Sequence, residues 1–460
     1  MAYYNRGEKV RKILLMAGVC ILWSNAVLAD TLNQVLSYSY ENNLTLQADR
    51  VAQKAIDEEV SKAKSGYRPL ISADGSIGRA HNSQEFLNTA GKQTYNQNPT
   101  SVQLSLNQPI FSGFSTMNSV KSAKKQVLAG RSNLLNAEQN ILLQTVSVYM
   151  DVIRDKAVLD LQENQEKVLQ KHLDSYRKRF KAGELTRTDV AQSEARASGA
   201  TAARIAADGQ LKMSQAMFFS VVGQAPNDLK DVESLDFNLP TTLVEAMELA
   251  MKQNPQILAA NYAQESARYA VSAQKGALLP SVNVGAAVGR AEENMTIDRN
   301  DFWNVKANVS VPLYQAGLEY ANIRQAKQNE NRYRILWNKT IQDVHAQVIS
   351  AWENYTASKA QVASIKDQIT ASKLALEGVI REAKVGSRTV LDVLDAEQEH
   401  LDNQVALVRV HHDEIVAAFA LMSAVGQMTP THLGLAVQPY DPTEYYEAVK
   451  NKWLGYGTDY

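Results

Sequence analysis

The sequence of 460 residues contains a single cysteine, Cys20, close to its amino terminus. A disulfide framework, a multi-cysteine metal site and thiol chemistry in the rest of the chain are therefore excluded. Charges almost cancel, with a net charge of −1 at pH 7 and 21% charged residues, so nothing indicates a nucleic-acid-binding surface. Beyond the amino-terminal segment no apolar run reaches the roughly 18 residues of a membrane-spanning helix, which excludes such a helix.

The residue patterns of common catalytic sites are also missing. The sequence has no HExxH zinc motif, no glycine-rich phosphate loop and no GxSxG nucleophile elbow. Glu397 and His400 match half of a di-iron helix motif, but no second Glu-x-x-His accompanies them. The neighbours His411 and His412 face different sides of a helix. We therefore expect neither an enzyme nor a bound cofactor.

Residues 1–29 have the pattern of a secretory signal peptide. A basic region precedes an apolar stretch at 13–23, and small residues at Val27-Leu28-Ala29 indicate a cleavage site. We expect the mature protein to begin near Asp30 and to be exported from a Gram-negative-type cell.

The remaining chain repeats itself after about 200 residues, the strongest signal in the sequence. Thr31 aligns with Thr242, Asn43 with Asn254 and Pro69 with Pro280 at one constant offset. This predicts two structural repeats and a proline-containing tail, with bounds at 30–224 (first repeat), 225–240 (linker), 241–426 (second repeat) and 427–460 (irregular or short-helical tail).

Each repeat is predicted to contain a helix, two strands and two long helices. In the first repeat the opening helix spans about 31–66, and a helix of about 65 residues runs from 115 to 180. Alternating residues predict strands, joined by polar loops near 81–100 and 292–301, at 68–80, 101–110, 279–290 and 303–313.

The two long helices of each repeat are joined by similar turns, one at Gly183 and one at Gly386. Glycine suits the left-handed position that ends a helix. A threonine three residues later and an aspartate six residues later predict a capping box that starts the next helix. The chain is therefore expected to reverse at both places, forming two helical hairpins.

The second long helix has the apolar seam of a coiled coil, in steps of three, four or seven. Its members are Ile323, Ala326, Tyr333, Trp337, Val344, Ala351, Tyr355, Val362, Ile365, Ile369, Leu376 and Val379. By itself this seam favours an exported coiled-coil scaffold or adhesin without a pore, which stays open as the alternative function.

The strands favour a membrane barrel instead. They alternate over about ten residues and have aromatic residues near their ends, as outer-membrane strands do, at Tyr67, Phe111, Phe302, Trp303 and Tyr314. Four strands cannot close a barrel, and an open edge cannot face lipid. We expect three copies of the chain to form a twelve-stranded barrel.

These residues together resemble the TolC family of outer-membrane exit ducts, over essentially all of the predicted mature chain. The resemblance rests on the strand exits NQPIF and VPLY and on both turns, most specifically GSRTVLDVLDAE at 386–397. It implies a homotrimer in outer-membrane lipid with a helical tunnel across the periplasm. It also implies two partners, a periplasmic adaptor (membrane fusion) protein and an inner-membrane transporter of RND or ABC type. The passengers would be drugs, secreted proteins or both.

The resemblance further implies a gate at the periplasmic tip. Asp392 and Asp395 match aspartates that ring the narrowest point, and the residues that match the bonds holding it shut are Arg388, Thr188 and Asp189. The chain departs from the family at Ala383, where a gating tyrosine is expected, so the closed state must be held in part differently.

The same turns are expected to dock the adaptor, through Gly183, Leu185, Thr186, Gly386, Ser387 and Thr389. For Asp189 and Asp392 a plain capping role explains the residues as well as a gate does. Asp395 lies one turn deeper, where a cap cannot explain it, and its alternative is a solvated helix face. Six carboxylates around a trimer axis would attract cations.

Overall fold

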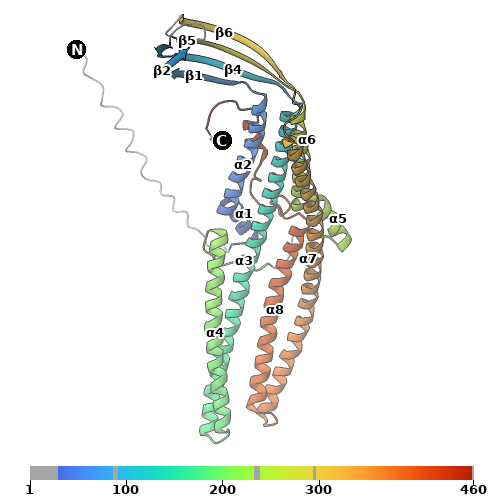
Figure 1. Ribbon diagram of the computed structural model, residues 1–460. Helices are drawn as coiled ribbons and strands as arrows, with labels where there is room; N and C mark the ends of the chain where they lie inside the picture. The colour runs from blue at the N-terminus through green and yellow to red at the C-terminus, as the bar shows by residue number, and fades with distance from the viewer. Residues whose placement is uncertain (1–29, 86–91, 233–238, 294–296, 458–460) are drawn as a thin grey trace, which may run out of the picture.

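The computed structural model describes residues 30–85, 92–232, 239–293 and 297–457. The predicted signal peptide lies outside these residues. The molecule is elongated, with a β-sheet at one end and two long helical hairpins at the other (Figure 1). None of the described helices is both long and apolar enough to cross a membrane.

The first repeat holds two short helices, a strand pair with a small hairpin inserted, and two long helices. Its main elements are α1 (Leu32–Asn42), α2 (Leu44–Lys64), β1 (Leu70–Ile77), β4 (Thr100–Ser112), α3 (Ser115–Lys181) and α4 (Arg187–Val222). A single 3₁₀ turn, η1 (Ser65–Tyr67), joins α2 to the sheet.

The second repeat follows the same order. It contains α5 (Leu243–Gln253), α6 (Pro255–Lys275), the 3₁₀ turn η2 (Gly276–Leu278), β5 (Ser281–Glu293), β6 (Ile297–Ser310), α7 (Leu318–Lys384) and α8 (Val390–Ala424). The tail adds one short helix, α9 (Thr443–Val449), among irregular segments, as predicted.

The single opening helix predicted over 31–66 is wrong, because the chain breaks at Asn43. Asn43 has an extended backbone, and its side chain accepts a hydrogen bond from the Leu46 N–H at 3.0 Å, which starts α2. Its amide also donates to the Val221 carbonyl oxygen at the end of α4, at 2.8 Å. Asn254 does the same in the second repeat, donating to Ala424 at 2.9 Å. The asparagine that aligned between the repeats therefore caps two helices at once.

The four main strands form one antiparallel sheet in the order β1-β4-β5-β6. Each strand pairs with its neighbours over most of its length, with irregularities after Pro109 and Ala291. Among the described strands, β1 and β6 each keep one edge without a partner in this chain. Such an edge is incompatible with lipid until another chain covers it.

Two predicted loops are shorter than expected. The segment 81–100 contains a second antiparallel pair, β2 (Ala80–Glu85) with β3 (Lys92–Gln97), whose polar side chains concealed the strand pattern. The loop expected at 292–301 is partly strand, because β6 already begins at Ile297. There Asp301 pairs with Arg290 at 2.7 Å and with Arg299 at 2.9 Å, which stabilises polar residues in extended conformation.

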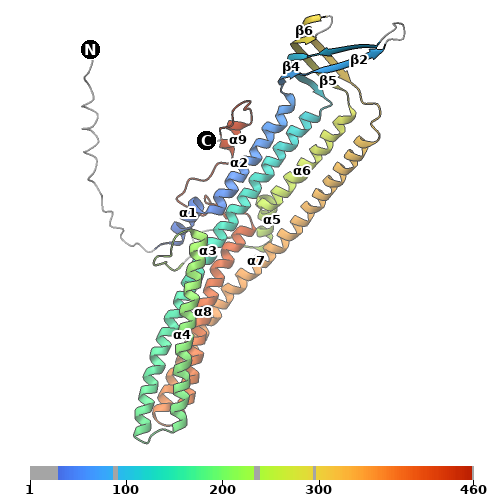
Figure 2. The ribbon, with the colours of Figure 1, turned by 60° about the vertical axis from the view of Figure 1, so that its left-hand side comes forward.

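The long helices lie side by side in the order α4, α3, α8, α7 (Figure 1), and Figure 2 shows both hairpins extending away from the sheet. Helices α3 and α7 have 67 residues each, about 100 Å at 1.5 Å per residue. Every residue of the predicted α7 seam is buried or half-buried, so that prediction is confirmed. The main core lies at mid-height, where α1, α3 and the end of α4 pack around Tyr149 and Phe218.

A tight crossing joins the sheet to the helices. A Cβ at Gly276 would lie 2.5 Å from the Gly113 carbonyl oxygen and 2.9 Å from the Ser115 nitrogen. Gly276→Ala should therefore destabilise the protein by about 1–3 kcal/mol through overpacking. Gly378→Ala is the matched control, since nothing lies within 4 Å of a Cβ there. That change should raise stability by up to about 1 kcal/mol through helix propensity. Thermal unfolding midpoints that fall equally for both variants would refute the close crossing.

Candidate gate at the helical hairpin tips

Both hairpin tips end a long helix with a left-handed glycine, as predicted. Gly183 has φ +79° and Gly386 has φ +84°. At the first tip the Glu184 N–H donates to the Arg179 carbonyl oxygen at 3.0 Å, and the Gly183 N–H donates to Phe180 at 2.9 Å. The second tip makes the same pair of bonds at 3.0 and 3.2 Å. This is the Schellman arrangement, which satisfies the last carbonyl groups of α3 and α7.

Capping boxes then start the returning helices, also as predicted. Thr186 Oγ1 accepts from the Asp189 N–H at 3.2 Å, and the Thr186 N–H donates back to the Asp189 carboxylate at 2.9 Å. Thr389 and Asp392 repeat this with distances of 3.2 and 2.8 Å. The bonds from the Thr389 backbone and side chain lower the pKa of Asp392. A capping role is thus established for both aspartates.

Arg388 bonds across its own turn. Its Nε lies 2.9 Å from a carboxylate oxygen of Glu382, at the end of α7. Ser387 binds the same residue, donating from Oγ to the Glu382 carbonyl oxygen at 3.0 Å. The hydrogen bond with Glu382, and then its charge and that of Asp392, raise the pKa of Arg388. This exposed pair stiffens the α7–α8 turn and does not reach the other hairpin.

Asp395 makes a polar contact between the two hairpins. Its Oδ1 lies 2.6 Å from Nη2 of Arg196, so the pair joins α8 to α4. Both side chains are about half exposed. The sequence identified Asp395 but missed Arg196, because α4 carries several arginines and a partner 199 residues away leaves no local pattern. A solvated helix face alone does not describe Asp395, since its carboxylate has a specific partner.

A second pair, with its carboxylate buried, begins two residues further along α8 and joins α8 to α3. His172 Nε2 is 2.9 Å from Glu397 Oε1, and the Glu397 side chain is only 6% exposed. The hydrogen bond with Glu397 raises the pKa of His172, more than burial lowers it. The His172 ring also stacks on Tyr176, with 5.7 Å between the centroids. His400 faces Ser372 instead, at 3.1 Å, so Glu397 and His400 bind different partners.

Apolar contacts surround these polar pairs. Leu185, at the first tip, packs against a buried cluster of Leu169, Tyr176, Ala197, Ala200, Val390 and Leu394. A groove of ≈ 490 Å³ lies between the two tips, with Ala383 and Arg388 in its wall. Thr188 is exposed. Of the predicted gate residues, Asp189 and Arg388 therefore line one groove, although they belong to different hairpins.

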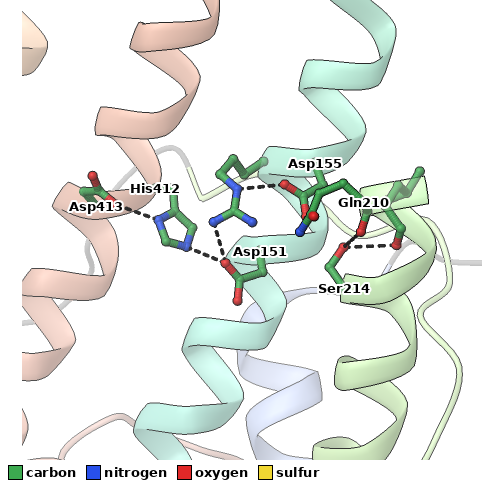
Figure 3. Close-up of polar contacts among 8 residues, drawn as sticks. Asp151, Asp155, Gln210, Ser214, His412 and Asp413 are labelled. Carbon is green, nitrogen blue, oxygen red and sulfur yellow. Dashed lines mark hydrogen bonds and ion pairs between the residues drawn. The ribbon is translucent and has the colours of Figure 1, made fainter. Parts of the chain in front are cut away.

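A second polar cluster fastens the hairpins at mid-height. Figure 3 shows His412 of α8 between Asp151 of α3, at 3.0 Å, and Asp413, at 2.9 Å. Arg154 pairs with Asp151 at 2.7 Å and with Asp155 at 2.8 Å. Burial lowers the pKa of His412, but the bonds with Asp151 and Asp413 outweigh it and leave the pKa raised. The cluster thus joins α3 to α8 far from the tips.

Comparisons with known proteins match this geometry. A family model described as outer membrane efflux protein matches residues 35–224 and 246–427, one segment in each repeat. The outer membrane efflux protein BepC of Brucella suis biovar 1 is 39% identical over 98% of this chain and 97% of its own. The outer membrane protein TolC of Vibrio cholerae is 24% identical over 88% of this chain and 93% of its own. Among solved structures, the CmeC outer membrane channel of Campylobacter jejuni has a TM-score of 0.78 at 16% identity, covering 91% of this chain and 89% of its own.

The His172–Glu397 pair predicts a pH-dependent contribution to stability. Because the folded pKa of His172 lies above its ordinary value of 6.5, the pair stabilises fully below that value and loses its effect as pH rises through the raised pKa. His172→Gln should therefore lower the thermal midpoint more at about pH 6 than at about pH 9. The control His400→Gln removes an imidazole that faces the Ser372 hydroxyl group and so measures the cost of losing a histidine from α8. An equal loss for His172→Gln at both pH values would contradict the charged pair.

Proposed function

We propose a gate and a docking surface for this chain from the premise that it belongs to the outer membrane efflux protein family, the TolC family. It is an outer-membrane efflux and secretion channel that extends into the periplasm. Channels of this family are trimers that work with transporters, and they are not enzymes. This membership replaces the alternative of an envelope scaffold or adhesin without a pore.

The trimer closes the sheet in this proposal. The free edges of β1 and β6 in one copy pair with those of its neighbours, and three copies give twelve strands. The β2–β3 pair, Glu293 at the end of β5 and Ile297 at the start of β6 then face outside the cell, because they lie at the end of the sheet remote from the helices (Figure 1). The tips lie at the periplasmic end.

The Arg196–Asp395 pair, at 2.6 Å, is the observation that carries the gate. Opening the tunnel requires the α7–α8 hairpin to move relative to α3–α4, and this pair is a direct polar bond between them, nearer the tip of α8 than the His172–Glu397 pair. Arg388 keeps the second turn rigid through Glu382, and Asp189 lines the groove from the first turn, with Thr188 next to it in sequence. In a trimer, Asp392 and Asp395 place six carboxylates around the axis. The pair between Arg196 and Asp395 holds the hairpins together in place of the gating tyrosine that is expected at the position of Ala383.

The tips themselves form the adaptor-docking surface of the proposal. Nothing lies within 4 Å of a Cβ at Gly183 or Gly386, and Thr186, Ser387 and Thr389 are exposed beside them. Leu185 offers an apolar contact at the groove. The partners are a periplasmic adaptor and an inner-membrane transporter of RND or ABC type. The relative that is 39% identical carries an efflux name, which favours small molecules as passengers.

The proposed gate predicts that variants of its polar bonds differ in how leaky the closed channel is. An exposed ion pair contributes about 0.2–1 kcal/mol. Three copies add to roughly 0.6–3 kcal/mol, enough to change a closed-to-open ratio by about 3- to 150-fold. Arg196→Ser should therefore raise single-channel conductance in planar bilayers more than Arg388→Ser, which breaks a bond within one hairpin. Wild-type conductance with Arg196→Ser would refute the role of the pair.

The carboxylate ring predicts a separate effect on selectivity. Asp392→Ala combined with Asp395→Ala should weaken cation selectivity and abolish block by divalent or trivalent cations added on the periplasmic side. Asp189→Ala is the control, since it removes an equivalent cap from the other hairpin. Unchanged selectivity and unchanged block in the double variant would leave these aspartates as a cap and an ion-pair partner only.

If the adaptor docks on the tips, a bulky side chain at either tip should stop export while trimers still assemble. Gly183→Trp and Gly386→Trp should raise drug sensitivity to that of a deletion strain. Alanine at these positions tests the backbone alone, because a side chain at a left-handed position costs roughly 1–2 kcal/mol. Gly209→Trp adds equal bulk to the exposed face of α4, away from the tips, and should preserve export. Normal export with the tip tryptophans would exclude the tips from docking.

A further inference from the structure

The carboxy-terminal tail of the chain runs along α2 to the end of the sheet that joins the helices. Helix α9 packs on α2, where the Tyr445 hydroxyl donates to Glu58 at 2.9 Å (Figure 2). Beyond α9, Lys64 Nζ donates to the Lys450 carbonyl oxygen at 3.0 Å and to the Asn451 side chain at 2.7 Å. These bonds hold the tail at the end of α2 that leads into the sheet.

Large apolar side chains follow directly, and the described part of the chain leaves them exposed. Trp453 is 64% exposed, Leu454 88%, and Tyr456 fully exposed. The Arg68 guanidinium lies over the Trp453 ring, 5.1 Å from its centroid. Arg68 stands two residues before β1, so Trp453 lies where the chain enters the membrane sheet.

Basic side chains surround the same place. The pKa of Lys64 is lowered, first by burial and then by the positive charges of Lys124, Lys450 and Arg68, with Glu447 opposing. Glu447 is already paired with Lys450. The local field is therefore positive, and it suits an anionic partner.

Other aromatic residues mark the same level of the molecule. Tyr67, just before β1, is 50% exposed, and Tyr314, just after β6, is 81% exposed. Both stand at the helix end of the sheet, where the outer-membrane channel leaves the bilayer. Tryptophan and tyrosine concentrate at such membrane–water interfaces, and lysine and arginine reach lipid phosphates from there.

We propose that the tail segment 452–456 is a membrane-interface anchor. Trp453, Leu454 and Tyr456 enter the headgroup region of the inner leaflet of the outer membrane, and Lys64, Arg68 and Lys124 bind the phosphates of anionic phospholipids. The anchor ties the base of the barrel and the helix α2 to the bilayer from outside the sheet. A neighbouring copy of the chain is the competing occupant for the same side chains.

Site-directed labelling tests the anchor in the intact trimer. In a Cys20→Ser background, Trp453→Cys carries a nitroxide spin label in nanodiscs of phosphatidylethanolamine with phosphatidylglycerol. Phe180→Cys is the matched control, an exposed aromatic position at the far tip of α3. The ratio of collisions with oxygen to collisions with a water-soluble nickel chelate should be several-fold higher at position 453 than at 180. Omitting phosphatidylglycerol should reduce the ratio at 453 alone.

Two results would overturn the anchor. A label at position 453 that collides freely with the nickel chelate lies in water. A label shielded from both reagents, with spin–spin broadening between protomers, lies under a neighbouring copy. A final experiment adds inorganic phosphate to the trimer in neutral detergent. Phosphate should not raise the collision ratio at position 453 as phosphatidylglycerol does. If it does, the basic cluster binds free phosphate and not lipid.

Discussion

The unpaired edges of β1 and β6 constrain the rest of the molecule. In lipid each unsatisfied backbone group costs several kcal/mol, because no water replaces the missing strand. Copies of the same chain can pair with these edges, so no second protein is needed. Closed symmetry then places a rotation axis through the assembly. The helices continue from the strand ends through the tight Gly113–Gly276 crossing, so the same axis governs how the tips meet.

The tips are built so that side chains, not the backbone, hold the two hairpins together. Each turn satisfies its own helix ends with a Schellman motif and a capping box. Helix α8 is then fastened to its neighbours at three levels, by His412 with Asp151 at mid-height, by buried Glu397 with His172, and by exposed Asp395 with Arg196. The bond nearest the tip is the most solvated, so it is the cheapest to break. This gradient suits a hairpin that moves at its tip and stays fixed at mid-height.

Most of the fold could be predicted from local patterns in the sequence. The turn glycines, both capping boxes, the α7 seam and the repeat depend on residues close together, and the structure agrees with all four. The break at Asn43 was missed because its bond to Val221 depends on a distant helix end. The β2–β3 pair was missed because polar strands lack alternation. At the candidate gate, Asp395 was predicted, whereas Arg196 and His172 were not, since their partners lie about 200 residues away along the chain.

Locking the Arg196–Asp395 contact tests the central claim most directly. In a Cys20→Ser background, Arg196→Cys with Asp395→Cys leaves a thiol on each hairpin, and a short bifunctional thiol reagent can bridge them across the length of the original pair. Before bridging, the missing ion pair should give a high single-channel conductance in planar bilayers. After bridging, conductance should fall to the wild-type level or below it, while either single cysteine should not respond. Conductance that stays high after complete bridging would contradict a gate that works by separating these two hairpins.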